Sequence, residues 1–236
     1  MIKAVFFDFY NTLVRFWPPV ENTQALVCAE FGIVLDKDSI KHGYVKADQL
    51  FNEENANYPL ASRTDNEREQ FFASYEQVIL KGAGTDVSLQ LAAKVWKRVS
   101  QVPKSLALFD DVIPALQDLK HRGLTLAVIS NLRQNMEIIF RELALTSYVD
   151  FYVTSKEVGA EKPHPPIFEV AMERAHIRPH EGIHVGDQYQ SDVLGARNVG
   201  LFSVLLDREE LNEQVKQCPL IKSLVEISDF LIEDHW

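Results

Sequence analysis

The chain has 236 residues, of which 46% are hydrophobic and 25% are charged, as in an ordinary globular protein. A net charge of −10 without a cluster of Lys and Arg disfavours nucleic acid as a partner. No apolar run approaches the ~20 residues of a membrane span or forms a signal peptide. The two cysteines, Cys28 and Cys218, fit no metal-ligand spacing and indicate a reduced compartment. We therefore expect a cytoplasmic protein.

Short apolar runs of strand length recur along the chain, at Ala4–Phe7, Leu124–Ile129, Phe151–Thr154, Ile183–Val185 and Phe202–Leu205. Amphipathic helical stretches separate the later runs, at Asp111–Arg122, Pro165–His176 and Ser191–Val199. Apolar strands that alternate with helices are typical of a parallel sheet covered on both faces. We predict an α/β fold, a Rossmann-like three-layer sandwich of about five parallel strands.

Residues from about 15 to 104 break this alternation. This block contains no convincing strand, and its helical stretches lie near Val20–Phe31, Asp38–Asn55, Asn66–Lys81 and Asp86–Val99. We predict a core domain of residues 1–14 and 105–236 and an inserted α-helical cap domain of residues 15–104. The insertion follows the carboxyl end of the first strand, where α/β proteins bind ligands, so we expect it to act as a lid.

Polar residues whose side chains could take part in a reaction follow predicted strands or begin predicted helices. They are Asp8 with Thr12, Ser130–Asn131, Lys162 in GAEKPHPPIF, and GDQYQSD at residues 186–192. In a parallel sheet these segments converge on one crevice. The set suits phosphoryl transfer: a carboxylate can be the nucleophile, Mg²⁺ prefers oxygen ligands, and lysine and hydroxyl donors offset the charge on the phosphoryl oxygens.

Taken in order, these motifs resemble those of the haloacid dehalogenase superfamily of hydrolases, most of which are phosphatases. The resemblance covers the whole chain: DxxxTL, a helical cap, SN, KPxPxIF and GDxxxxDxxGAxxxG. It implies that Asp8 is the nucleophile and that Lys162 stabilises charge on Asp8 and on the transferring group. It also implies that Ser130 and Asn131 bind that group, that Thr12 forms a hydrogen bond near the nucleophile, and that the cap closes over the substrate.

The resemblance further implies a Mg²⁺ site. Asp8, Asp187 and the main-chain carbonyl of Tyr10 would hold the metal, and Asp192 would bind it directly or order its water shell. His184 lies inside a predicted strand, and we expect it to be a core residue and no ligand.

Tyr10 departs from the phosphatase pattern, which carries a second aspartate there as general acid and base, worth roughly 10²–10⁴-fold in rate. A tyrosine with a pKa of about 10 cannot replace it well at neutral pH. The dehalogenase branch does carry tyrosine here, because a halide leaves without protonation; that branch works without a metal, lacks the Gly–Asp pair, and has glycine where this chain has Asn11. The Tyr10 side chain is expected either to pack at the cap hinge or to form a wall of the substrate pocket.

The leading expectation is a Mg²⁺-dependent phosphatase that acts on a small phosphorylated metabolite through an aspartyl-phosphate on Asp8. One alternative is a 2-haloacid dehalogenase that forms an ester on Asp8. The other is a non-catalytic protein that binds a phosphate or a metabolite.

Overall fold

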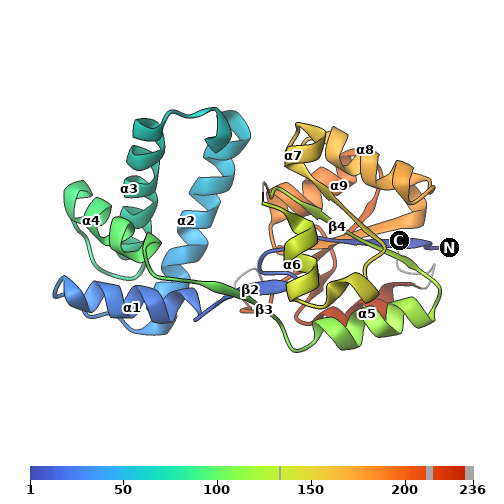
Figure 1. Cartoon of the computed structure of the whole chain (residues 1–236), viewed down its shortest axis with the longest axis horizontal. Helices are drawn as coiled ribbons and strands as arrows, with labels where there is room; N and C mark the ends of the chain where they lie inside the picture. The colour runs from blue at the N-terminus through green and yellow to red at the C-terminus, as the bar shows by residue number, and fades with distance from the viewer. Residues whose placement is uncertain (133, 211–214, 232–236) are drawn as a thin grey trace. The chain divides into compact units, whose positions relative to one another are not determined.

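The computed structural model describes residues 1–132, 134–210 and 215–231. The chain divides into two compact units, one formed by Met1–Arg15 with Leu106–Trp236 and the other by Phe16–Ser105. The first unit contains the parallel sheet, and the second is helical (Figure 1). Each unit has hydrophobic clusters of its own, and each is described below by itself.

The first unit is built around a parallel sheet, which has six strands within the described residues in the order β5-β4-β1-β6-β7-β8. Its strands are β1 (Ala4–Phe7), β4 (Thr125–Ser130), β5 (Phe151–Thr154), β6 (Gly182–Gly186), β7 (Phe202–Leu206) and β8 (Leu220–Ile221). Its α-helices are α5 (Val112–His121), α6 (Met136–Glu142), α7 (Ser155–Val158), α8 (Pro165–Arg174) and α9 (Gly195–Asn198). Short 3₁₀ turns lie at Leu145–Ser147, Pro179–Glu181 and Leu224–Leu231. The α/β class is confirmed, and the two-residue β8 adds a sixth strand to the five expected.

Helices cover both faces of this sheet (Figure 1). Successive residues of a strand point to opposite faces. Val5 and Phe7 of β1 belong to the hydrophobic cluster that includes α5 and α6. Ala4 and Phe6 belong to the cluster that includes α8 and α9. The central strand is therefore buried on both sides, which explains its continuous apolar sequence and gives the predicted three layers.

The helix predicted at Ser191–Val199 begins earlier, as a wide π-helical turn at Tyr189–Leu194 that continues into α9. The main-chain N–H of Asp192 donates to the carbonyl of Gln188 at 2.8 Å. The Asp192 side chain lies against Gly186, where a Cβ atom would sit 2.2 Å from the Asp192 carboxylate. The glycine of this motif is thus needed because the carboxylate occupies the space of a side chain.

The sequence analysis missed two short strands, one at the start of the 15–104 block, where it expected no strand, and one that directly follows that block. β2 (Val14–Trp17) and β3 (Ser105–Leu108) pair as a separate two-stranded sheet where the chain leaves and re-enters the first unit. Each strand has only four residues, and its partner lies at the other end of the helical block. The pairing that stabilises these strands is therefore invisible to a local pattern.

The second unit consists of helices close to the four predicted stretches: α1 (Val20–Glu30), α2 (Lys37–Asn57), α3 (Asp65–Gly82) and α4 (Leu89–Ser100), with a 3₁₀ turn at Leu60–Ser62. Side chains define where these helices begin. The Asp36 carboxylate accepts the Ser39 N–H at 2.8 Å before α2, and Thr64 forms a capping box with Glu67 before α3.

Helices α2 and α3 approach each other at two glycines. A Cβ on Gly43 would lie 2.2 Å from the main-chain oxygen of Ile79, and a Cβ on Gly82 would lie 2.7 Å from the Cα of Gly43. The backbones are therefore in contact, and only glycine fits at this crossing.

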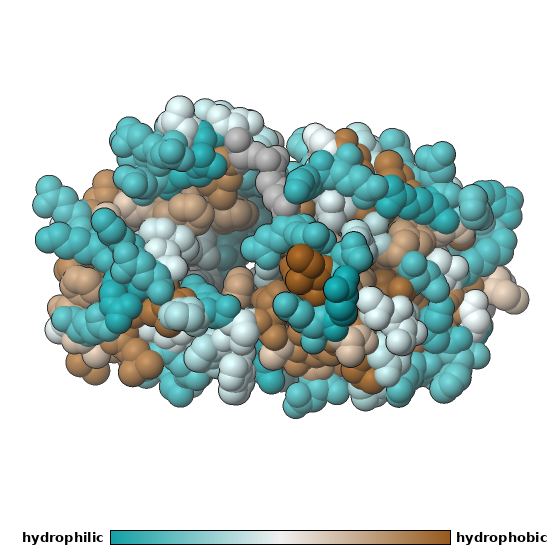
Figure 2. Space-filling view, viewed as in Figure 1, coloured by the Kyte–Doolittle hydropathy of each residue, from teal (hydrophilic) through white to brown (hydrophobic). Residues whose placement is uncertain are grey.

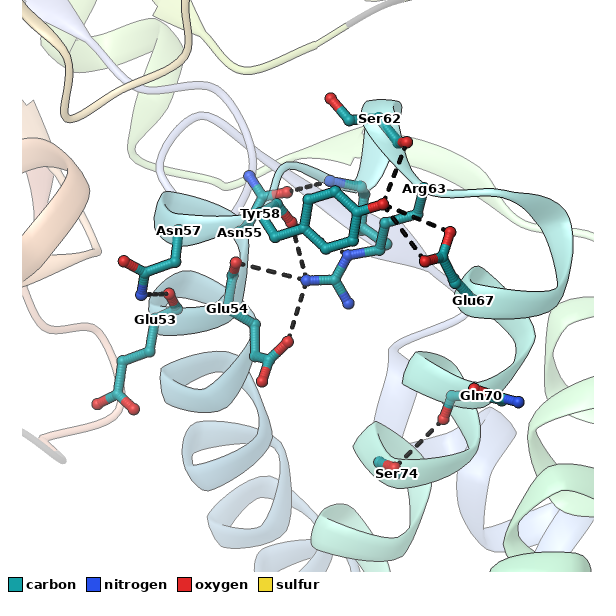
Figure 3. A network of polar contacts seen from close by, with 11 residues as sticks. Glu53, Glu54, Asn55, Asn57, Tyr58, Ser62, Arg63, Glu67, Gln70 and Ser74 are labelled. Atoms are coloured by element: carbon teal, nitrogen blue, oxygen red, sulfur yellow. Dashed lines mark hydrogen bonds and ion pairs between the residues drawn. The ribbon is translucent and has the colours of Figure 1, made fainter.

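Arg63 holds the joint between α2 and α3 (Figure 3). Its guanidinium donates to the Tyr58 carbonyl at 2.8 Å and to the Glu54 carboxylate at 3.0 Å. It also lies over the rings of Tyr58 and Phe71, at 5.0 and 4.6 Å from their centroids. The arginine is almost fully buried, and these contacts compensate its charge.

Hydrophilic side chains cover most of the molecular face shown in Figure 2, with hydrophobic side chains scattered between them. Among the helices of the described residues, none combines the length and the apolar character that a membrane crossing requires.

Candidate active site

The polar residues singled out in the sequence lie at one edge of the sheet. The last residue of β1 pairs in parallel with β4 and with β6. Asp8 directly follows β1, Ser130 ends β4, and Asp187 directly follows β6. Lys162 comes from the segment between α7 and α8. The carboxyl ends of three neighbouring strands thus bring these residues to one place, as the doubly wound topology requires.

The Lys162 ammonium lies between two carboxylates. Its Nζ atom is 2.5 Å from Oδ1 of Asp8 and 2.6 Å from Oδ1 of Asp192. Only 3% of the lysine side chain is exposed, so its charge requires such partners. Burial alone would lower the pKa of Lys162, but the charges of Asp192 and Asp8 raise it well above its usual range. The ammonium is a permanent positive charge beside Asp8.

Asp192 is held from several sides. Besides Lys162, its Oδ1 atom contacts Nε2 of His184 at 3.0 Å, and its Oδ2 accepts the main-chain N–H of Gln188 at 3.0 Å. Burial alone would raise the pKa of Asp192, but Lys162 and His184 hold it well below its usual range. This carboxylate is therefore ionised at neutral pH.

Asp8 has a different balance. Burial, together with the negative charge of Asp192, raises its pKa to about 6, although Lys162 and the Phe9 N–H oppose the shift. Two carboxylates share one ammonium here, and Asp192 receives the additional donors. Asp8 is consequently the more basic of the two, which suits a nucleophile.

The carboxylates also form a possible cation site. One oxygen each of Asp8, Asp187 and Asp192 lies within 4.8 Å of the others. Carboxylate oxygens are ligands that Mg²⁺ takes in proteins. The close approach of Asp192 to Gly186 keeps one of these carboxylates in place.

Asn131 contacts the main chain of Lys162, and its expected role in binding the transferring group stays a prediction. Its side-chain amide donates to the main-chain oxygen of Lys162 at 3.0 Å, and its Oδ1 accepts the Lys162 N–H at 2.7 Å. This reciprocal pair joins the segment after β4 to the segment that carries the lysine. Ser130 is buried at the end of β4 beside it.

Comparisons with known proteins agree with this arrangement. The family model described as haloacid dehalogenase-like hydrolase matches residues 2–200. The chain belongs to this family of hydrolases. A haloacid dehalogenase-like hydrolase domain-containing protein 3 from Xenopus laevis is 28% identical over 205 residues, which are 87% of this chain and 84% of that protein. A glyceraldehyde 3-phosphate phosphatase from Methanothermobacter thermautotrophicus is 30% identical over 215 residues, which are 89% of this chain and 87% of that protein.

The fold is also found in solved structures of the family. The crystal structure of a 2-haloacid dehalogenase from Pseudomonas syringae pv. Tomato has a TM-score of 0.57 at 23% identity and covers 98% of both chains. This chain, which is 30% identical to a phosphatase, thus shares its fold with a dehalogenase. The fold alone therefore does not distinguish phosphate hydrolysis from dehalogenation.

Thr12 does not form the hydrogen bond expected near the nucleophile. Its hydroxyl is buried and has no hydrogen-bond partner among the described residues. Its main-chain oxygen instead accepts a hydrogen bond from Arg208 at 2.8 Å. In this hydrolase the residue is tied into the turn after β1 by its backbone.

Tyr10 is half-buried and packs against the core. Its ring meets that of Phe9 edge to face, with centroids 5.4 Å apart, and it packs against the hydrophobic cluster of the first unit. Burial and the charge of Asp8 raise the pKa of its phenol. The side chain is therefore even less able to exchange a proton at neutral pH than a free tyrosine.

Sequence reasoning missed the contact between His184 and Asp192. His184 lies in β6 as a fully buried core residue, as expected, and its ring meets that of Phe168 edge to face at 5.2 Å. Burial lowers its pKa, so the ring is neutral, and Nε2 carries the hydrogen donated to Asp192. A polar residue in an otherwise apolar strand, two positions before Gly186, was the available signal.

Proposed function

We propose that the protein is a Mg²⁺-dependent phosphatase that hydrolyses a small phosphorylated metabolite through an aspartyl-phosphate on Asp8. The observation that carries this proposal is that a carboxylate oxygen of Asp187 lies within 4.8 Å of carboxylate oxygens of Asp8 and Asp192. A metal-free dehalogenase has no use for Asp187, whereas transfer of a charged phosphoryl group requires a cation beside the nucleophile.

The donor set fits Mg²⁺. Three carboxylates offer oxygens, and the metal usually completes its octahedral shell with water. Asp8 and Asp187 would hold the ion with the main-chain carbonyl of Tyr10, and Asp192 would bind it directly or through water. When bound, the ion supplies positive charge for the phosphoryl oxygens.

The residues of the chain then divide the reaction between them. One Asp8 oxygen attacks phosphorus, and the bond between phosphorus and the substrate oxygen breaks. Lys162 stabilises the charge on Asp8 and on the transferring group, with Ser130 as a further donor. Water next attacks phosphorus, the bond to Asp8 breaks, and phosphate leaves. Asn131 positions Lys162 through its main chain.

Tyr10 sets a limit on the leaving group. The phosphatase pattern places an acid at this position, but here the raised pKa of the phenol leaves no efficient proton donor there. We therefore expect slow turnover of alkyl phosphates and faster turnover of acyl or aryl phosphates, whose leaving groups need no proton. Hydrolysis of alkyl phosphates at the ordinary rate of about 1–10³ s⁻¹ would contradict this argument.

The relatives support a small phosphorylated substrate. One is named a glyceraldehyde 3-phosphate phosphatase, and another, 29% identical over 211 residues, a ribulose-1,5-bisphosphate 5-phosphatase. We propose that the helical unit Phe16–Ser105 acts as the cap that selects the substrate. Both cysteines are free, which supports the cytoplasmic location included in this proposal.

A substrate panel with and without Mg²⁺ tests the proposal. Wild-type protein should release phosphate from aryl phosphates only with Mg²⁺, and Asp8→Asn should lower kcat by about 10³-fold or more. Tyr10→Asp should gain alkyl phosphatase activity. If Mg²⁺ with beryllium fluoride stabilises the fold but no substrate turns over, the protein binds phosphate without catalysis.

Tyr10 also keeps a second candidate open, 2-haloacid dehalogenation. Asp8 would displace halide from carbon, and water would then attack the carboxyl carbon of the resulting ester. Chloride release from 2-chloropropionate in the presence of EDTA would establish this reaction. Turnover in ¹⁸O-water separates the chemistries further, because ester hydrolysis puts solvent oxygen into Asp8, whereas the phosphatase puts it into phosphate.

A further inference from the structure

Arg208 connects parts of the first unit that are far apart in sequence. It follows β7, and its Nη2 atom donates to the main-chain oxygen of Thr12 at 2.8 Å. Its Nη1 atom donates to Oδ2 of Asp111 at 2.8 Å. Its guanidinium carbon lies 4.0 Å from the centroid of the Phe109 ring. Only 14% of this side chain is exposed, so the arginine is fixed by its partners and is not a mobile surface charge.

Asp111 is itself anchored. The carboxylate oxygen that binds Arg208 also accepts the Ser223 hydroxyl and the Leu224 N–H, each at 2.8 Å. Burial alone would raise the pKa of Asp111, but the bonds from Arg208, Leu224 and Ser223 hold it below its usual range. The ion pair is therefore intact at neutral pH and tied to the segment that follows β8.

The other end of this contact is the turn that carries the nucleophile. After Asp8 the chain reverses through Asn11, whose φ of 59° is left-handed. The N–H groups of Leu13 and Val14 both donate to the carbonyl of Phe9, at 2.9 and 3.0 Å. These hydrogen bonds within the turn fix its conformation. The position of the turn in the molecule is set by the groups that bind those of its main-chain carbonyls that point away from it.

Two neighbouring outward carbonyls are bound by the same group of residues. Arg208 takes that of Thr12, and the N–H of Phe109, whose ring lies under Arg208, donates to that of Leu13 at 3.2 Å. The Arg208–Asp111–Phe109 group, called here the turn clamp, thus fixes the turn directly after the nucleophile.

We propose that Arg208 is a positioning residue for the reaction, which places the Asp8 carboxylate by clamping the turn at Thr12. This inference rests on the proposed function. Reacting atoms must be held close to the geometry of attack, and a displacement of about 1 Å can lower the rate about 10²-fold. Arg208 acts through the backbone, at the carbonyl of Thr12.

Arg208→Met and Arg208→Lys test the inference with p-nitrophenyl phosphate and Mg²⁺. We expect kcat of Arg208→Met to fall about 10- to 100-fold while KM changes less than about twofold, because the turn moves and the remaining site persists. Lysine reaches only one acceptor at a time, so Arg208→Lys should recover part of kcat.

Arg174 provides a matched control. It likewise joins a carboxylate, that of Glu157, to a main-chain oxygen, that of Tyr152 at 3.1 Å, but it does not touch the turn after β1. Arg174→Met should keep kcat within about twofold. An equal fall in both variants, or an unchanged kcat in Arg208→Met with only a lower Tm, would overturn the inference.

Hydrogen exchange supplies a readout that needs no turnover. The amides of Leu13 and Val14 should exchange faster in Arg208→Met and not in Arg174→Met. If Arg208→Met does not fold, Asp111→Asn takes its place in the measurements of kcat and of amide exchange. We expect a smaller fall in kcat and a smaller increase in exchange for this variant. If the wild-type protein hydrolyses no phosphate ester, the proposed function fails; faster exchange at the turn then still supports the clamp, and unchanged exchange overturns it.

Discussion

The two units each bury carboxyl groups, and they treat them differently. In the first unit, Lys162 lies within 2.6 Å of both Asp8 and Asp192. In the helical unit, Asp48 accepts a hydrogen bond from the neutral Tyr75 at 2.6 Å, and Glu76 accepts one from the neutral Gln24. A cation compensates the first pair, whereas neutral donors bind the second.

The pKa values follow from this difference. Burial raises the pKa of Asp48 to about 6 and that of Glu76 to about 7, opposed in part by their hydrogen bonds and, for Glu76, by the charge of Lys104. Oε2 of Glu76 is buried without a hydrogen-bond partner among the described residues. In the first unit Asp192 therefore keeps its charge, although burial still raises the pKa of Asp8 to about 6, while the helical unit is most stable when its buried acids are protonated.

Lys162→Met should break the first half of this comparison. Removal of the ammonium leaves Asp8 and Asp192 buried without their cation, so the free energy of unfolding should fall by about 3–5 kcal/mol and phosphatase activity should disappear. Urea denaturation followed by circular dichroism measures the first effect. Lys120→Met is the control, because its ion pair with Asp150 is partly exposed and should contribute less than about 1 kcal/mol. Similar losses in both variants would contradict the account.

Glu76→Gln should sharpen the second half. The folded pKa of about 7 lies above the ordinary value of 4.5, so the wild-type helical unit loses stability as pH rises from about 4.5 to about 7. Glutamine carries no charge. At pH 8 the variant should be more stable than wild type by up to about 3 kcal/mol, and at pH 4 the two should be equal.

Hydrogen exchange of α3 amides at both pH values measures this difference. Fluorescence of Trp96, which stacks on Phe72 at 4.5 Å, reports on the same unit. A Glu76→Gln variant that is less stable than wild type at pH 8 would show that Glu76 is ionised and paired.

Gly43→Ala should loosen the helix pair that carries Asp48 and Glu76. A Cβ at this position would lie 2.2 Å from a main-chain oxygen of α3, which cannot move aside like a side chain. We expect a loss of about 2 kcal/mol in the helical unit, measured by exchange of α2 amides. Unchanged exchange would mean that the helices separate freely.

His184→Leu should have the smallest effect, through one of the donors to Asp192. Compared with His184→Gln, whose amide can still donate, the leucine variant should be about 1 kcal/mol less stable in urea denaturation. Equal stability of the two variants would show that the Nε2 contact contributes nothing.

The sequence alone predicted the sheet and the polar residues gathered at one of its edges well, because each signal was local. Apolar runs identified the strands, and Asp8, Lys162 and Asp192 stood at motif positions beside them. The convergence of the motifs expected in a parallel sheet also predicted that Asp187 and Asp192 lie near Asp8, and the family resemblance implied the same grouping.

Contacts between distant segments could not be predicted in this way. The amide of Asn131 pairs with the main chain of Lys162, and Arg208 binds the carbonyl of Thr12, without any pattern near either partner. The strands β2 and β3 depend on each other across the whole helical unit. The buried acid Glu76 looked like any polar residue of an amphipathic helix, since its burial depends on how the helices pack.

The covalent intermediate is the most direct test of the central claim. Wild-type protein in excess over an aryl phosphate, with Mg²⁺, is quenched in acid within the first turnover, and the peptide that contains Asp8 is weighed by mass spectrometry. The account predicts one phosphoryl group on Asp8, absent from Asp8→Asn and absent when EDTA replaces Mg²⁺. Phosphate release at an unchanged rate in Asp8→Asn, or without any adduct on Asp8, would contradict it.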